Sequence, residues 1–147
     1  MRVMPTTAVV LDVLQGLLEA EQASVFRFMR SGSPYLTRAT LETRDRVERM
    51  AAGTDRRVRE LGELIERIGG MAHLRPVQPE NQYLAFLSLK FLLPKLAGSK
   101  HVTIERYENA LRALKGASAE VRGVLERQLV EHREESALLE AERGSPG

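Results

Sequence analysis

The stretch from Leu14 to Phe28 constrains the fold most, because it places a carboxylate on an otherwise apolar helical face. Leu14, Leu18, Val25 and Phe28 mark that face, and Glu21 falls in its middle. In helical bundles, glutamates that project inward from facing helices are the ligands of metal-carboxylate sites. Without a metal, a buried carboxylate needs a cationic partner or a proton. Glu21 therefore predicts a polar site inside a helical bundle.

The composition favours a single helical domain. The chain has 147 residues, of which 43% are hydrophobic, 29% are charged and only 5% are aromatic, with no Trp. A chain of this length buries roughly two thirds of the surface of its unfolded form, which is enough for one core. Few aromatic residues suit aliphatic helix packing better than a sheet sandwich. We expect residues 1–143 to form one domain and residues 144–147 to be a disordered tail.

Charge and cysteine content exclude several classes of function. The 22 basic and 20 acidic residues leave a net charge of +2, which gives no reason to expect nucleic acid as a partner. The chain has no cysteine, so disulfides, thiolate metal sites and nucleophilic cysteines are excluded. Lys90 and Lys95 interrupt the most apolar segment, so no membrane span is expected. We expect a soluble, cytoplasmic protein.

Start and stop signals divide the chain into helices. Thr6 or Thr7 can cap a first helix, and Ser33-Pro34 can start a second. Gly69-Gly70 supplies a left-handed stop for the second helix, and Ser118 can cap the last one. The expected helices run over about residues 7–30, 34–68, 100–115 and 118–142.

The segment from Glu80 to Ala97 is apolar on most sides, and we interpret it as a crossover helix that is kinked or ends near Pro94. Gly98-Ser99 then predicts a stop followed by a new N-cap. Two antiparallel helical hairpins joined by a long, partly helical crossover form an all-α four-helix bundle. A plain up-down bundle is the alternative.

Two histidines lie at the same height in the second hairpin. His101 and His132 are each about fifteen residues from the turn, or roughly 23 Å at 1.5 Å per residue. His132 continues an apolar stripe, and His101 lies one turn before the apolar Ile104. Together with Glu21, these histidines are candidate ligands of an iron or zinc ion.

The sequence resembles the ferritin-like superfamily, and its small bundle families more closely than ferritin itself. The resemblance runs from Val9 to Leu139 and is carried by the segments LLEAEQASVFRFM, LGELIERIGG, IERYENALRAL and LERQLVEHREESALLE. It implies a ferritin-like four-helix bundle with a dinuclear metal centre and a Glu-x-x-His motif on the second and fourth helices. It also implies homodimers that pair through the first two helices.

The residues at the matched motif positions imply a degenerate metal site. Thr54 and Arg57 match the first motif, and Leu129 and His132 match the second. The third helix would contribute Lys100 or His101. Because bridging carboxylates are not found, the resemblance does not imply an intact ferroxidase site.

Three interpretations of Glu21 remain open. It forms a metal-free ion pair with Arg57, with Thr54 and Tyr107 as further polar partners in the core. It holds Fe or Zn together with His101 and His132. It points into a solvated seam.

Two functions correspond to these interpretations. The first is a non-catalytic association or structural protein that has no cofactor. The second is a metal-binding protein for iron or zinc storage, or an oxidoreductase. In either case we expect a homodimer, with the second helix or the crossover at the interface.

Overall fold

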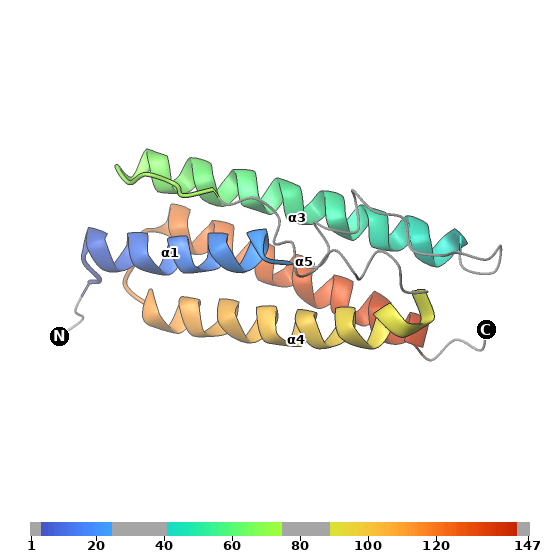
Figure 1. Ribbon diagram of the computed structural model, residues 1–147. Coiled ribbons are helices and arrows are strands. Elements are labelled where there is room, and N and C mark those ends of the chain that lie inside the picture. Colours follow the sequence, from blue (N-terminus) through green and yellow to red (C-terminus); the bar gives the residue numbers. More distant parts are fainter. Residues whose placement is uncertain (1–3, 25–40, 75–88, 144–147) are drawn as a thin grey trace.

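The structure, a computed structural model, describes residues 4–24, 41–74 and 89–143. This part of the chain contains four α-helices and no strand, which confirms the expected all-α four-helix bundle (Figure 1). The helices are α1 (Thr7–Gln22), α3 (Leu41–Arg67), α4 (Leu89–Ala113) and α5 (Ala119–Arg143).

The helices pack as two antiparallel pairs. α1 lies against α3 and α4 lies against α5, and contacts of α1 with α4 and of α3 with α5 close the bundle. Figure 1 shows that α3 and α4 run in the same direction. The end of α3 and the beginning of α4 therefore lie at opposite ends of the bundle. Residues 80–88 of the expected crossover helix lie outside the described residues.

The N-terminal caps form as expected. The Thr6 hydroxyl accepts a hydrogen bond from the backbone N–H of Val9 at 3.2 Å, and the Ser118 hydroxyl accepts one from Val121 at 3.3 Å. Each cap satisfies one N–H group that the first helical turn leaves unpaired. α1 ends at Gln22, so the expected extension to residue 30 is not continuous, and residues 25–40 lie outside the described part.

The left-handed stop after α3 is also confirmed. Gly69 has a φ of 94°, and its N–H donates to the Glu66 carbonyl at 3.1 Å. The N–H of Gly70 donates to the Ile65 carbonyl at 2.9 Å. These two bonds form a Schellman motif, which requires a residue with positive φ at the position of Gly69.

The expected break at Gly98-Ser99 is wrong. α4 is continuous from Leu89 to Ala113 and contains Pro94, although proline removes one helical hydrogen bond. Gly98 is not among the described residues with positive φ, because Gly69 is the only one. Leu96, Ala97 and Lys100 are at most 2% exposed, so burial of this stretch outweighs its local stop signals.

We predict that Gly98→Ala stabilises the protein by about 0.5–1 kcal/mol, because alanine is favoured over glycine inside a helix. A methyl group at Gly98 would meet nothing within 4 Å. Gly69→Ala is the matched control, since it has equal room but should cost about 1–2 kcal/mol in a left-handed conformation. Urea unfolding measures both. A loss of stability in Gly98→Ala would mean that α4 is broken there.

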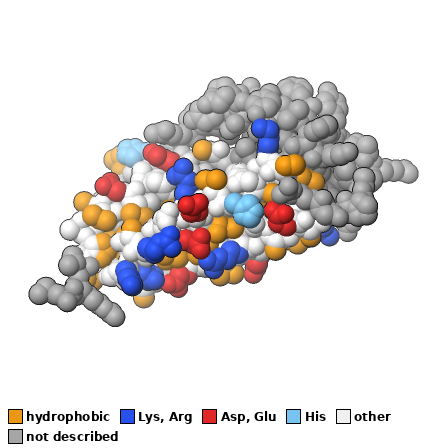
Figure 2. Space-filling model, turned by 90° about the horizontal axis from the view of Figure 1, so that it is seen from below, with side chains coloured by type: hydrophobic (Ala, Val, Ile, Leu, Met, Phe, Trp, Pro, Cys, Tyr) orange, Lys and Arg blue, Asp and Glu red, His pale blue; other side chains and the backbone are white. Residues whose placement is uncertain are grey.

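The apolar core fills the half of the bundle near the α4–α5 turn. Its buried residues come from all four helices and are Val10, Leu14, Leu17, Leu18, Leu61, Leu64, Ile65, Tyr107, Ala110, Leu114, Val121, Leu125 and Leu129. On the face seen in Figure 2, acidic, basic and apolar side chains are intermixed. The buried polar residues lie beyond this apolar cluster, towards the other end of α5.

Candidate functional site

Glu21 lies in the last turn of α1 and is only 1% exposed. Its Oε1 atom is approached from each of the other three helices. The Nε of Arg57 on α3 lies at 3.2 Å, the hydroxyl of Tyr107 on α4 at 2.8 Å, and the Nε2 of His132 on α5 at 2.5 Å. The inward position predicted from the apolar stripe therefore places this carboxylate at the centre of the bundle.

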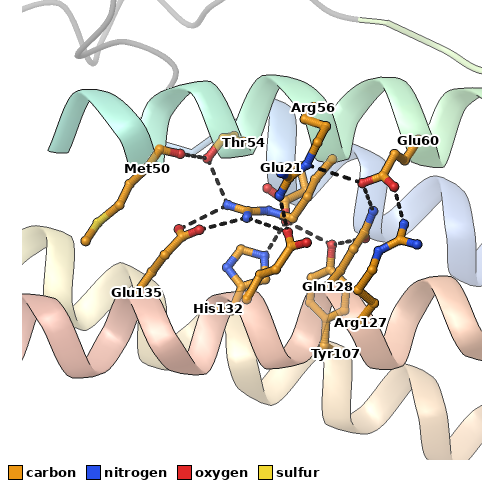
Figure 3. A network of polar contacts seen from close by, with 12 residues as sticks. Glu21, Met50, Thr54, Arg56, Glu60, Tyr107, Arg127, Gln128, His132 and Glu135 are labelled. Atoms are coloured by element: carbon orange, nitrogen blue, oxygen red, sulfur yellow. Dashed lines mark hydrogen bonds and ion pairs between the residues drawn. The ribbon is translucent and has the colours of Figure 1, made fainter. Parts of the chain in front are cut away.

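Arg57 is fully buried, and each of its three nitrogens has a partner. Its two terminal nitrogens lie 2.9 Å and 3.2 Å from the two carboxylate oxygens of Glu135, while Nε donates to Glu21. The same terminal nitrogens also donate to Glu131 and to the Thr54 hydroxyl, each at 3.2 Å. One guanidinium thus links α3 with α1 and α5, and its fork matches the carboxylate of Glu135. In Figure 3, Glu21, Thr54 and Glu135 lie around the same point between the helices.

Lys100 is the second buried cation, and it is 2% exposed. Its Nζ lies 2.5 Å from Oε1 of Glu135 and 2.9 Å from Nδ1 of His132. An ammonium group can only donate hydrogen bonds, so Nδ1 of His132 is the acceptor. The ring proton is therefore on Nε2, which donates to Glu21. His132 is a neutral imidazole between a cation and an anion.

Tyr107 extends the network towards the surface. Its hydroxyl lies 2.8 Å from both Oε1 of Glu21 and Oε1 of Gln128, and its single proton can be donated to either acceptor. The Gln128 amide lies 3.4 Å from Glu60, which also pairs with the exposed Arg127. The polar chain thus runs from the bundle centre to the seam between α3 and α5 (Figure 3).

The contacts set the protonation of the two carboxylates. Burial raises the pKa of Glu21, but His132, Arg57 and Lys100 outweigh it and lower the pKa from 4.5 to about 2. Burial also raises the pKa of Glu135, and the neighbouring Lys100 and Arg57 again lower it below 4.5. Both groups are therefore ionised at neutral pH.

The pKa values of the basic groups are shifted in different directions. Burial lowers the pKa of Arg57, but Glu21 and Glu135 outweigh it, so the pKa lies above its usual value. Burial lowers the pKa of Lys100 and of His132, although Glu135 and Glu21 act against this. The basic side chains of Arg57 and Lys100 thus face the carboxylates of Glu21 and Glu135, and burial disfavours the charged form of His132 between them.

The structure brings together most of the residues singled out in the sequence. Glu21, Thr54, Arg57, Tyr107 and His132 all belong to this network. Of the three open interpretations, Glu21 therefore does not point into a solvated seam, and its ion pair with Arg57 is formed.

His101 does not join the network. Its side chain is 62% exposed and its Nε2 lies 3.3 Å from Glu140 on the surface. One residue is about 100° of rotation around a helix, so the unbroken α4 turns Lys100 inward and His101 outward. Lys100 lies seven residues before Tyr107, which is about two helical turns, and this spacing predicts that both side chains lie on the same face of α4.

Glu135 was missed by the sequence analysis, although it lies three residues after His132 and so shares its helical face. Gln128 was missed as well, four residues before His132. A glutamate in a charged segment gives no sign of burial by itself. The signal lies in its spacing from His132.

As arranged, these side chains do not fit a metal ion. Oε1 of Glu21, both ring nitrogens of His132 and both carboxylate oxygens of Glu135 are already engaged by Arg57, by Lys100 or by one another. Within the described ranges there is no group of three or more His, Asp or Glu side chains that could hold a metal ion. The cations of the protein occupy the space between the ligand atoms.

The comparisons with known proteins add no functional information. The chain matches no protein-family model, no curated protein and no solved structure. None of the described helices combines the length and apolarity needed to cross a membrane. Function is therefore inferred from the geometry of the buried network.

Proposed function

We propose that this protein is a ferritin-like bundle that functions by self-association, and that two side-chain cations replace the metal ions of its core. The single observation that carries the proposal is the guanidinium of Arg57, which is 0% exposed and lies within 3.2 Å of both Glu21 and Glu135. A buried carboxylate needs a positive partner, and here the chain itself supplies it.

The helix directions support the ferritin-like part of the proposal. α1 and α3 are antiparallel, α4 and α5 are antiparallel, and α3 and α4 run in the same direction (Figure 1). This arrangement needs one connection along the length of the bundle, which distinguishes the ferritin-like topology from an up-down bundle.

The loss of ligand atoms supports a non-catalytic role. Metal-dependent oxidation needs a metal with an open coordination position. Here the position matched to a motif histidine is Arg57, and the inward residue of α4 is Lys100. Both are cations that repel a metal ion.

Apolar side chains on the α1–α3 hairpin support self-association. Met4 before α1 and Val9 in its first turn are 69% and 43% exposed, and Met71 and Leu74 after α3 are 76% and 69% exposed. The other exposed large apolar residues in the described part of the chain are Val102 on α4 and Val130 and Leu138 on α5, and they are 44–54% exposed. The most exposed apolar side chains therefore flank α1 and α3, and exposed apolar surface can mark an interface. The apolar residues Met50 and Leu64 of α3 do not contribute, because they are buried within the chain. We assign the dimer interface to the α1–α3 hairpin.

The alternative function, iron or zinc storage or an oxidoreductase, is favoured by one contact. Glu21 and His132 lie 2.5 Å apart at the bundle centre. The third expected ligand, His101, is on the surface, so this alternative would require the network to rearrange.

One experiment tests the proposal against this alternative. The protein is purified without chelator. Its mass is measured by light scattering at tens of micromolar, with and without added Zn²⁺ or Fe²⁺, and bound metal is measured by titration with the same ions. We expect a dimer in both conditions and no stoichiometric metal. A monomer would contradict self-association. Stoichiometric metal that is lost in a Glu21→Ala, His132→Ala double variant would establish the metal-binding alternative.

A further inference from the structure

His132 has the surroundings of a metal-bound histidine, except that an ammonium group occupies the place of the metal. Its Nε2–H donates to the buried carboxylate of Glu21 at 2.5 Å. Its Nδ1 points at the Nζ of Lys100 at 2.9 Å. Histidines that bind metals nearly always donate their second ring N–H to a carboxylate or carbonyl, which fixes the tautomer and makes the other nitrogen more basic.

A carboxylate completes the surroundings of this ammonium group. Oε1 of Glu135 lies 2.5 Å from the Nζ of Lys100, on the same helical face as His132. The two terminal nitrogens of Arg57 in turn donate hydrogen bonds to Glu135 and hold it in place. One imidazole nitrogen and one carboxylate oxygen thus converge on a single positive charge, and their orientation is fixed by further hydrogen bonds.

We infer that the ammonium group of Lys100 takes the place of a divalent cation of the zinc class between Nδ1 of His132 and the carboxylate of Glu135, and that a third ligand at position 100 would let these two groups bind such a cation, with His132 oriented by Glu21. Imidazole nitrogen and carboxylate oxygen are both zinc ligands. The inference rests on the proposed function, because it concerns one of the two side-chain cations that neutralise the core. It goes further by assigning to this cation the position that a metal ion would take.

Substitution of Lys100 by glutamate would supply the third ligand. A glutamate side chain is shorter than lysine, so the introduced carboxylate would stop short of the present Nζ position. That leaves space for an ion about 2.0–2.2 Å from the carboxylate oxygen. With His132 and Glu135, the variant would offer three ligands, which is the number that zinc sites with an open position use.

Charge balance makes the variant depend on the metal. The parent core holds the cations Arg57 and Lys100 against the anions Glu21 and Glu135. Lys100→Glu would leave three buried carboxylates with one cation, and a divalent cation would restore the balance. Metal binding and stability should therefore be coupled in this variant.

Glu135 is more exposed than Lys100 and His132. Glu135 is 14% exposed and lines a surface pocket of about 240 Å³ between α3 and α5. The other described residues that line it are Arg46, Arg49, Met50 and Leu138. Glu135 thus links this partly exposed pocket with the buried ammonium group of Lys100.

The test compares Zn²⁺ binding by Lys100→Glu and Lys100→Met, using calorimetric titration and thermal melting. Lys100→Met is the matched control, because methionine is similar in length but brings neither the charge nor the oxygen ligand. We expect Lys100→Glu to bind about one Zn²⁺ per chain and to melt at a higher temperature with Zn²⁺. Lys100→Met should show neither effect. A second substitution, His132→Gln, should abolish binding by Lys100→Glu.

A further variant tests the role of Glu21 as a positioning residue. Adding Glu21→Gln to Lys100→Glu should weaken Zn²⁺ binding by roughly 10- to 100-fold, since Glu21 only orients the imidazole. If Lys100→Glu folds only with Zn²⁺, the inference is supported. If Lys100→Glu does not fold even with Zn²⁺, Lys100→His decides, because it adds a neutral third ligand without a third carboxylate.

Each failure has a separate meaning. Zn²⁺ binding by Lys100→Glu or Lys100→His that does not exceed that of Lys100→Met overturns this inference and leaves the proposed function standing. Stoichiometric Zn²⁺ in the parent protein would instead overturn the proposed function.

Discussion

Replacing Arg57 with alanine should lower the free energy of unfolding by about 3 kcal/mol or more. The change removes the only guanidinium that reaches both Glu21 and Glu135 within the described part of the chain. Glu21 is 1% exposed, so water cannot solvate its stranded charge. Removing one partner of a buried pair costs more than the pair contributes, because the remaining charge is left uncompensated.

The neighbouring residue provides the matched control. Arg56 also pairs with Glu131, but its side chain is 50% exposed. Arg56→Ala should cost less than about 1 kcal/mol, as is usual for surface ion pairs. In thermal unfolding, Arg57→Ala should melt roughly 10 °C below the parent for a chain of this size. If both variants melt within a degree or two of the parent, Arg57 does not neutralise a buried carboxylate.

Acid should destabilise the protein strongly, beginning below about pH 6.5. The pKa of Glu21 is lowered from 4.5 to about 2, so its contribution to stability is complete above 4.5 and is lost as the pH falls towards 2. This difference in pKa corresponds to about 3 kcal/mol. Glu135 acts in the same direction, because its pKa is also lowered.

His132 extends the sensitivity to milder acid. Because its folded pKa is lowered from 6.5, the unfolded chain takes up a proton first as the pH falls below 6.5, which favours unfolding. The pKa of Lys100 is lowered from 10.5, so raising the pH towards 10.5 deprotonates it more readily in the folded chain and favours folding. All four groups therefore make stability rise with pH.

Urea unfolding at a series of pH values between 7 and 2.5 measures this dependence. Glu21→Gln should show a shallower loss of stability below pH 4.5 than the parent, because it lacks the carboxylate with the lowered pKa. The quantity to compare between the two proteins is the change in stability between pH 4.5 and 2.5, and not the stability at pH 7. Parallel curves for the parent and Glu21→Gln would show that Glu21 does not carry the acid sensitivity.

The features predictable from the sequence are those that depend on one helix alone. Thr6, Ser118 and Gly69 act as caps wherever their helices pack, since each bonds to backbone groups a few residues away. Glu21 and His132 were predicted to face inward because each interrupts an apolar stripe of its own helix. The pairing of Glu21 with Arg57 followed from electrostatics, because a buried carboxylate needs a nearby cation.

The remaining features depend on packing between helices. Local signals at Pro94 and Gly98 predicted a break, but buried Leu96 and Lys100 hold α4 against its neighbours. That continuity decides whether position 100 or position 101 faces the core. The bidentate contact between Arg57 and Glu135 depends on the relative rotation of α3 and α5. Helical periodicity within one segment does not determine this rotation.

A double-mutant cycle between Glu21 and Arg57 tests most directly whether side-chain cations neutralise the core. The variants are Glu21→Gln, Arg57→Met and their combination, where methionine fills space without adding charge. We predict a coupling energy of roughly 1.5–3 kcal/mol, with the double variant losing much less stability than the sum of the single losses. If the stability losses of the two single variants add up to the loss of the double variant within about 0.5 kcal/mol, the prediction is contradicted, because the losses at independent sites add in this way.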